Sequence, residues 1–241
     1  MALVRHLAAL DEGEIRSRAA ARWLSRRGPE GAARALGALL GRAAEPGTAA
    51  ALAALGEALG DTRLLAYEWT AATYAAARSL ELHGVAALLL SPAPHRPWTE
   101  PRDRADPAVA RLTLGHKKSL GRLRRDPDLL ARLVAEGDPD VVREVLRNPM
   151  LVEEDAVRIA ARRPARPETL RLLHLDRRWR TRAAVRRALA RNPYAETGMV
   201  LRILPTLALR VLEEIGADPA VHPVVRETAG RLAGERRGRG G

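Results

Sequence analysis

The stretch VVREVLRNP at residues 141–149 returns 44 residues later as VRRALARNP at residues 185–193. The segment that follows each copy keeps the same offset, because AVRIA at 156–160 matches VLRIL at 200–204. In the second copy, Ala184, Val185, Ala188 and Leu189 fall on one side of a helix. The chain is therefore expected to contain a repeat of about 40–47 residues that is built from pairs of helices.

Proline dipeptides explain why the predicted helices are short. An Asp before Pro favours a helix start, as at Asp126-Pro127, Asp138-Pro139 and Asp218-Pro219. The Asp carboxylate can cap the helix, and the Pro sits at the first helical position, where its missing N–H costs no hydrogen bond. Asn before Pro ends a helix, as at Asn148-Pro149 and Asn192-Pro193. Helices of about ten residues are unstable alone, so stacking against neighbours must stabilise them.

This Asp-Pro, Val-x-Arg and Arg-Asn-Pro pattern over about residues 111–233 resembles HEAT-like repeats, particularly the leucine-rich-variant type found in bacterial proteins. The resemblance implies a superhelix of paired helices that offers an interaction surface. Residues 162–182 depart from regular spacing, because Pro164, Pro167 and an Arg-Trp-Arg segment intervene.

Composition favours an all-α protein, and the resemblance implies an α-α superhelix (a HEAT-like solenoid), which we expect to follow an N-terminal helical bundle. The core must be built from Ala, Leu, Val and Ile, since aromatic residues make up only 3% and Phe is absent. We expect an Ala-rich bundle at 1–90, a Pro-rich linker or strap at 91–107, HEAT-like repeats at 108–235 and a flexible basic tail at 236–241.

Charge is distributed unevenly along the chain. Residues 1–100 have a net charge of +1, whereas residues 101–241 have +11, which indicates an anionic partner. The candidate binding residues are the basic run after the linker and the arginine face of the helix near 181–191, together with one tryptophan: Lys117, Lys118, Arg122, Arg124, Arg125, Trp179, Arg182, Arg186, Arg187 and Arg191.

Each of these features has two interpretations. The arginine face could bind phosphate or carboxylate groups, or it could be a solvated face with salt bridges to an adjacent repeat. Trp179, between Arg178 and Arg180 and near Asp176, could stack on a base, as an acid, Trp and Arg do in some HEAT-like DNA glycosylases. A tryptophan at a repeat junction can equally be a packing residue.

Catalytic motifs are missing from the sequence. It contains no Cys, no paired histidines of the HExxH kind and no Gly-x-Ser-x-Gly, so we predict no enzyme activity, no metal and no cofactor. We predict a cytoplasmic, non-enzymatic α-solenoid scaffold that binds an acidic protein partner and does not enter membranes. A nucleic-acid-binding module is the alternative, and a DNA glycosylase a remote one; the residues alone leave the partner's identity and the oligomeric state open.

Overall fold

A computed structural model describes residues 2–10, 13–43, 45, 47–99 and 106–238. Within these ranges the chain forms helices and connecting segments, with no strand, so the predicted all-α class is confirmed. The chain divides into two compact units. Unit 1 comprises residues 1–93 and 196–241, and unit 2 comprises residues 94–195. In sequence, unit 2 is therefore inserted into unit 1.

Unit 1 is built around α4, which spans Thr48–Leu59. This helix is apolar on almost every side, as a helix enclosed by others must be. It packs against helices from both ends of the chain, including α2 (Gly13–Ser25) and α14 (Thr197–Ile203). The other elements of unit 1 are α1 (Ala2–Ala8), α3 (Gly28–Leu40), α5 (Tyr67–Ser79), α6 (His83–Leu88), the 3-10 helix η1 (Leu204–Thr206), α15 (Leu209–Ala217) and α16 (Pro223–Arg237).

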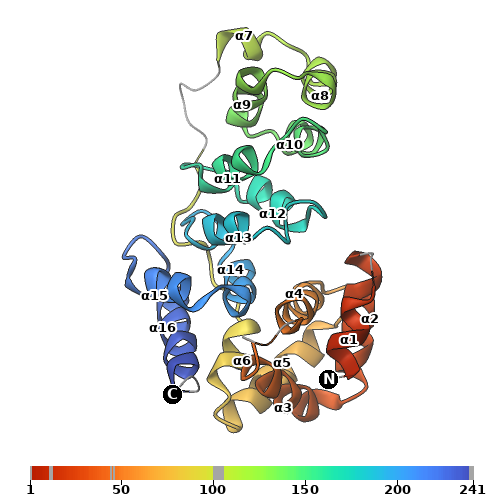
Figure 1. Ribbon diagram of the computed structural model, residues 1–241, viewed down its shortest axis with the longest axis vertical. Helices are drawn as coiled ribbons and strands as arrows, with labels where there is room; N and C mark the ends of the chain where they lie inside the picture. Colours follow the sequence, from red (N-terminus) through yellow and green to blue (C-terminus); the bar gives the residue numbers. More distant parts are fainter. Residues whose placement is uncertain (1, 11–12, 44, 46, 100–105, 239–241) are drawn as a thin grey trace. The chain divides into compact units, whose positions relative to one another are not determined.

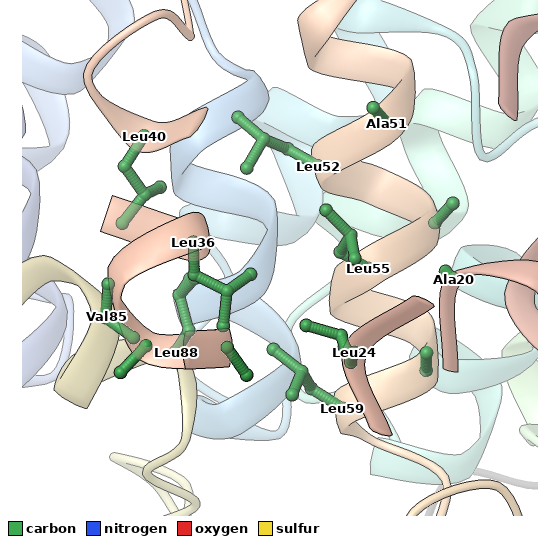
Figure 2. Close-up of a cluster of buried hydrophobic side chains, with 14 of the residues drawn as sticks. Ala20, Leu24, Leu36, Leu40, Ala51, Leu52, Leu55, Leu59, Val85 and Leu88 are labelled. Carbon is green, nitrogen blue, oxygen red and sulfur yellow. The ribbon is translucent and has the colours of Figure 1, made fainter. Parts of the chain in front are cut away.

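The core of unit 1 consists of leucine, valine and alanine side chains. Figure 2 shows the cluster, in which Leu24 of α2 and Leu36 of α3 lie among residues of α4 and α6, including Leu52, Leu55, Leu59, Val85 and Leu88. Burying one such leucine side chain away from water stabilises the folded state by about 1.5–3 kcal/mol. The many buried alanines let neighbouring helices approach closely without large side chains between them.

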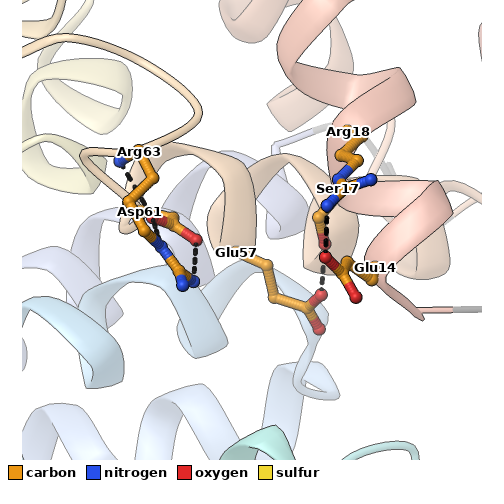
Figure 3. A network of polar contacts seen from close by, with 6 residues as sticks. All are labelled: Glu14, Ser17, Arg18, Glu57, Asp61 and Arg63. Carbon is orange, nitrogen blue, oxygen red and sulfur yellow. Dashed lines mark hydrogen bonds and ion pairs between the residues drawn. The ribbon is translucent and has the colours of Figure 1, made fainter.

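A polar contact joins α2 to the central helix. Ser17 Oγ donates a hydrogen bond to Glu57 Oε2 over 2.6 Å, beside the ion pair of Glu14 with Arg18 (Figure 3). Asp61 accepts from the backbone amide of Arg63 and forms an ion pair with its side chain. Asp61 therefore shapes the loop before α5 and does not cap that helix, which begins at Tyr67.

Unit 2 contains two sets of three helices. The first set is α8 (Leu114–Leu123), α9 (Pro127–Glu136) and α10 (Pro139–Leu146), preceded by the short α7 (Pro107–Ala110). The second set is α11 (Glu153–Ala161), α12 (Pro167–Leu175) and α13 (Ala183–Ala190). In each set the first helix packs against the third, and the sets join where α10 packs against α12 (Figure 1).

Two asparagines, the only ones in the chain, occupy matching places in these sets. Asn148 Nδ2 donates to the carbonyl oxygens of Gly121 and Arg124 at the end of α8. Asn192 Nδ2 does the same with Ala160 and Arg162 at the end of α11. Each asparagine thus satisfies carbonyls that a helix end leaves without intrahelical partners. The 44-residue sequence offset is therefore also an offset in local structure.

Aspartates before proline behave in two ways. Asp126 and Asp138 accept hydrogen bonds from backbone amides of the first turns of α9 and α10, as predicted. Asp218 does not start a helix, because α15 ends before it and α16 begins at Pro223. Its carboxylate accepts from the Ala220 amide, and this turn repeats the geometry that follows Asn148 and Asn192.

The predicted domain boundaries require correction. Residues 197–237 do not continue the helical array of 108–195, since α14 packs on α4 and α6, and α16 on α6, all within unit 1. The helix α14 ends at Ile203, and a 3-10 turn that contains Pro205 separates it from α15.

The predicted linker and tail also differ from the structure. Residues 91–99 form no helix and bend at His95 and Arg96, whereas 100–105 lie outside the described residues and Pro107 begins α7. Arg236 and Arg237, assigned to a flexible tail, belong to α16. Arg236 donates to the carbonyl oxygens of Leu207 and Pro205, which holds the end of the helix against the turn before α15. Residues 239–241 lie outside the described part.

Candidate binding surface

The first group of candidate residues lies on α13 and its two caps, and we call Arg182, Arg186, Arg187 and Arg191 the α13 basic surface. Val185 and Leu189 are fully buried on the opposite side, which fixes the orientation of the helix. Arg182 is the N-cap residue and Arg191 the C-cap residue. Arg182 and Arg187 are exposed, whereas Arg186 and Arg191 are half-buried.

Arg182 and Arg186 both contact other groups of unit 2. The Arg182 guanidinium lies 3.7 Å from the carboxylate of Glu153, at the start of α11. Arg186 donates weakly to the Thr181 carbonyl oxygen over 3.4 Å, and burial lowers the pKa of its guanidinium from the ordinary value. Arg182 is thus an exposed cation that also forms an ion pair between α11 and the start of α13.

The second group, the α8 basic segment, comprises Lys117, Lys118, Arg122, Arg124 and Arg125. Lys117 is paired with Glu136 of α9 over 2.6 Å, and both side chains are largely buried. Lys118 is half-buried, while Arg122, Arg124 and Arg125 are exposed at and beyond the end of α8. Lys117 is therefore a structural ion pair, and the three arginines are the available cations of this segment.

The structure does not gather the two groups into one cluster. The α8 segment packs with α9 and α10, whereas α13 packs with α11 and α12. Within unit 2, α8 lies at one end and α13 at the other (Figure 1). A partner that contacts both would have to extend along the unit.

Trp179 must be reassigned. Its side chain is 2% exposed, so it is a packing residue and cannot stack on a base at the surface. The neighbouring Arg178 lies over its ring, 4.3 Å from the centroid, and donates to the carbonyl oxygens of Asn148 and Leu151. Asp176 accepts from the amides of Arg178 and Trp179. This loop joins the two helix sets and does not form a glycosylase-like site.

The charge asymmetry also holds between the two units. Unit 2 holds 24 Lys and Arg against 14 Asp and Glu, a net charge of +10. Unit 1 holds 17 against 15, a net charge of +2, even though it includes the last 46 residues. Nearly all of the excess positive charge therefore belongs to unit 2.

In the described ranges, no helix has the length and apolarity needed to cross a membrane. The same part of the chain contains no group of three or more His, Cys, Asp or Glu placed to hold a metal ion. Comparisons of the chain with protein-family models, curated proteins and solved structures found no match.

Proposed function

We propose that this chain is a non-enzymatic interaction protein that binds an acidic partner protein through unit 2, which acts as a HEAT-like helical repeat array. The observation that carries the proposal is the net charge of +10 on unit 2 against +2 on unit 1. A field of this size attracts acidic partners and accelerates their association.

The comparison of α10 with α13 supports this proposal. Arg143 and Arg147 of the first set form ion pairs with Asp140 and Glu144, three residues earlier on the same helix. Their equivalents 44 residues later are Arg187 and Arg191, but Ala184 and Ala188 replace the acids. The second set thus keeps the arginines and loses the acidic residues that neutralise them within the helix.

Duplex nucleic acid is the alternative partner, because the α13 basic surface could contact phosphates as well as carboxylates. The burial of Trp179 favours the protein partner, since it removes the one aromatic ring that we had proposed for base stacking. The two alternatives differ in the ligand that should bind more tightly. Comparing the affinities for a short acidic peptide and for a short DNA duplex would distinguish them.

The 44-residue offset provides matched variants for the test. Arg187→Gln with Arg191→Gln removes two cations from the α13 basic surface, and Arg143→Gln with Arg147→Gln removes the equivalent paired cations from α10. Exposed ion pairs contribute about 0.2–1 kcal/mol each, so the first variant should bind a fluorescein-labelled acidic peptide roughly two- to thirtyfold more weakly at low salt. The second variant should change the affinity less.

Fluorescence anisotropy at low and moderate salt would decide between the outcomes. Binding of the peptide that weakens with salt, and weakens further in the α13 variant, supports the proposal. Binding of the duplex alone, with a salt slope of about −0.9 per phosphate contact, supports the nucleic-acid alternative. Absence of binding to either ligand at low salt contradicts both.

A further inference from the structure

A narrow crevice of about 180 Å³ lies between α9 and α11 in unit 2. One wall is formed by Leu130, Ala131 and Val134 of α9, and the other by Ile159 of α11. Val145 of α10 and Leu151 of the following loop complete its apolar lining. The α9 helix packs against α8 and α10, and α11 against α12 and α13, so the crevice marks the junction of the two helix sets.

The size and chemistry of the crevice suit one large apolar side chain. A cavity of about 150 Å³ lined by aliphatic side chains is large enough to bind benzene and remains dry when empty. The other aliphatic lining residues are almost fully buried, whereas Ala131 and Pro127 are exposed, so the space has a buried apolar floor and opens to solvent beside α9. Such a site admits a single side chain and not a whole helix.

Basic residues surround this apolar lining. Arg158 and Arg162 of α11 line the crevice together with one acid, Asp155. The Arg158 side chain is 72% exposed although it pairs with Asp155. Arg124 and Arg125, both exposed, immediately precede the start of α9, where Pro127 also lines the crevice. Acidic residues of a partner that lie next to an apolar side chain in the crevice would therefore contact several cationic side chains.

We propose that this crevice receives a leucine- or phenylalanine-sized side chain of the acidic partner, flanked by acidic residues that contact Arg158, Arg124 and Arg125. This inference rests on the proposed function and adds the chemistry of the partner segment. Burial of one large apolar side chain strengthens binding by about ten- to a hundredfold. Charge alone supplies no such preference for an apolar residue.

The test uses the full chain and two labelled peptides that consist of Glu, Gly and Ser and differ at one central position, Leu or Ser. A variant, Ala131→Leu, fills the crevice from an exposed position of α9, and Ala72→Leu makes the same change at an exposed position of α5 in unit 1. The Leu peptide should bind the parent protein about ten- to a hundredfold more tightly than the Ser peptide. Ala131→Leu should abolish that preference, and Ala72→Leu should keep it.

Each contrary outcome has a distinct meaning. Equal, salt-dependent affinity of the two peptides overturns the crevice site but leaves the proposed function intact, and this comparison needs no variant to fold. Absence of binding by either peptide removes both proposals. A leucine preference that persists in a folded Ala131→Leu variant places the side chain elsewhere. Self-association of the parent chain that Ala131→Leu abolishes, seen by sedimentation velocity, assigns the crevice to a second copy and also overturns the proposal.

Discussion

Replacing Asn148 or Asn192 by alanine should destabilise unit 2 strongly. Asn148 is 1% exposed, and its side chain donates over 2.9 and 2.7 Å to Gly121 and Arg124 and accepts over 2.9 Å from Met150. The equivalent three bonds of Asn192 measure 2.8, 2.9 and 3.0 Å. Alanine would leave two carbonyl oxygens and one amide without these partners.

The magnitude follows from the cost of unsatisfied groups. Each buried backbone group that loses its partner costs about 1–3 kcal/mol, less where water enters, so we expect a total loss of about 3 kcal/mol of unfolding free energy. The two variants should agree within about 1 kcal/mol, because their hydrogen bonds are equivalent. Asn→Asp at either position should also destabilise, since it turns an acceptor toward the two carbonyl oxygens.

Urea unfolding followed by circular dichroism measures the loss, and hydrogen exchange with mass spectrometry locates it. Exchange should accelerate in α8 and α10 for Asn148→Ala and in α11 and α13 for Asn192→Ala, so that each variant serves as a control for the other. A loss below about 0.5 kcal/mol in either variant, the level of an ordinary surface substitution, would refute the reasoning.

Three further predictions concern the organisation of the chain. Excising residues 94–195 and joining the ends through a short glycine linker should leave unit 1 helical and cooperatively folded, as circular dichroism would measure. The two ends lie close together, because Thr197 Oγ1 donates a hydrogen bond to the Ala93 carbonyl oxygen over 2.8 Å. Loss of helical structure would contradict the unit boundary. Arg178→Ala should lower the unfolding free energy by about 2 kcal/mol in urea titrations, because the carbonyl oxygens of Asn148 and Leu151 lose a charged hydrogen-bond donor. An unchanged urea midpoint would show that these hydrogen bonds do not stabilise unit 2. Asp138→Ala should cost about 1 kcal/mol in the same assay through loss of the α10 cap, and an effect within error would argue against that cap.

Local structure could be predicted from the sequence where capping chemistry is strong. The helices α9 and α10 begin at Pro127 and Pro139, as the Asp-Pro pairs predict, because a capping Asp followed by Pro defines a helix start. Pro167 begins α12 in the same way, although no capping Asp precedes it. The same reasoning was wrong for Asp218, since an Asp-Pro pair can also follow a helix. A dipeptide alone does not distinguish the two cases.

The buried face of α2 depends on tertiary packing and could not be predicted from the sequence. Ile15, Ala19 and Trp23 recur every four residues along α2 and so share one side of the helix, but Ile15 is exposed and Ala19 and Trp23 are only partly buried. The buried face instead carries Ser17, whose hydroxyl binds Glu57. From the sequence alone, a polar residue is expected at the surface, even when a hydrogen bond to a residue far away in the chain allows it to be buried.

The candidate surface was predictable only in part. Exposed arginines on α13 followed from helical periodicity, but the partner of Lys117 on α9 and the burial of Trp179 depend on tertiary contacts. The crevice between α9 and α11 left no signal, because its lining residues have the same spacing as any buried helix face. Assignment of the excess charge to unit 2 required the packing of α14 on α4.

Hydrogen exchange of the full chain with and without a saturating acidic peptide tests the central claim most directly. We expect the peptide to slow exchange in unit 2, at α8, α9, α11 and α13, while the described helices of unit 1 keep their rates. Protection confined to 1–93 and 196–238, with unit 2 unchanged, would contradict the account.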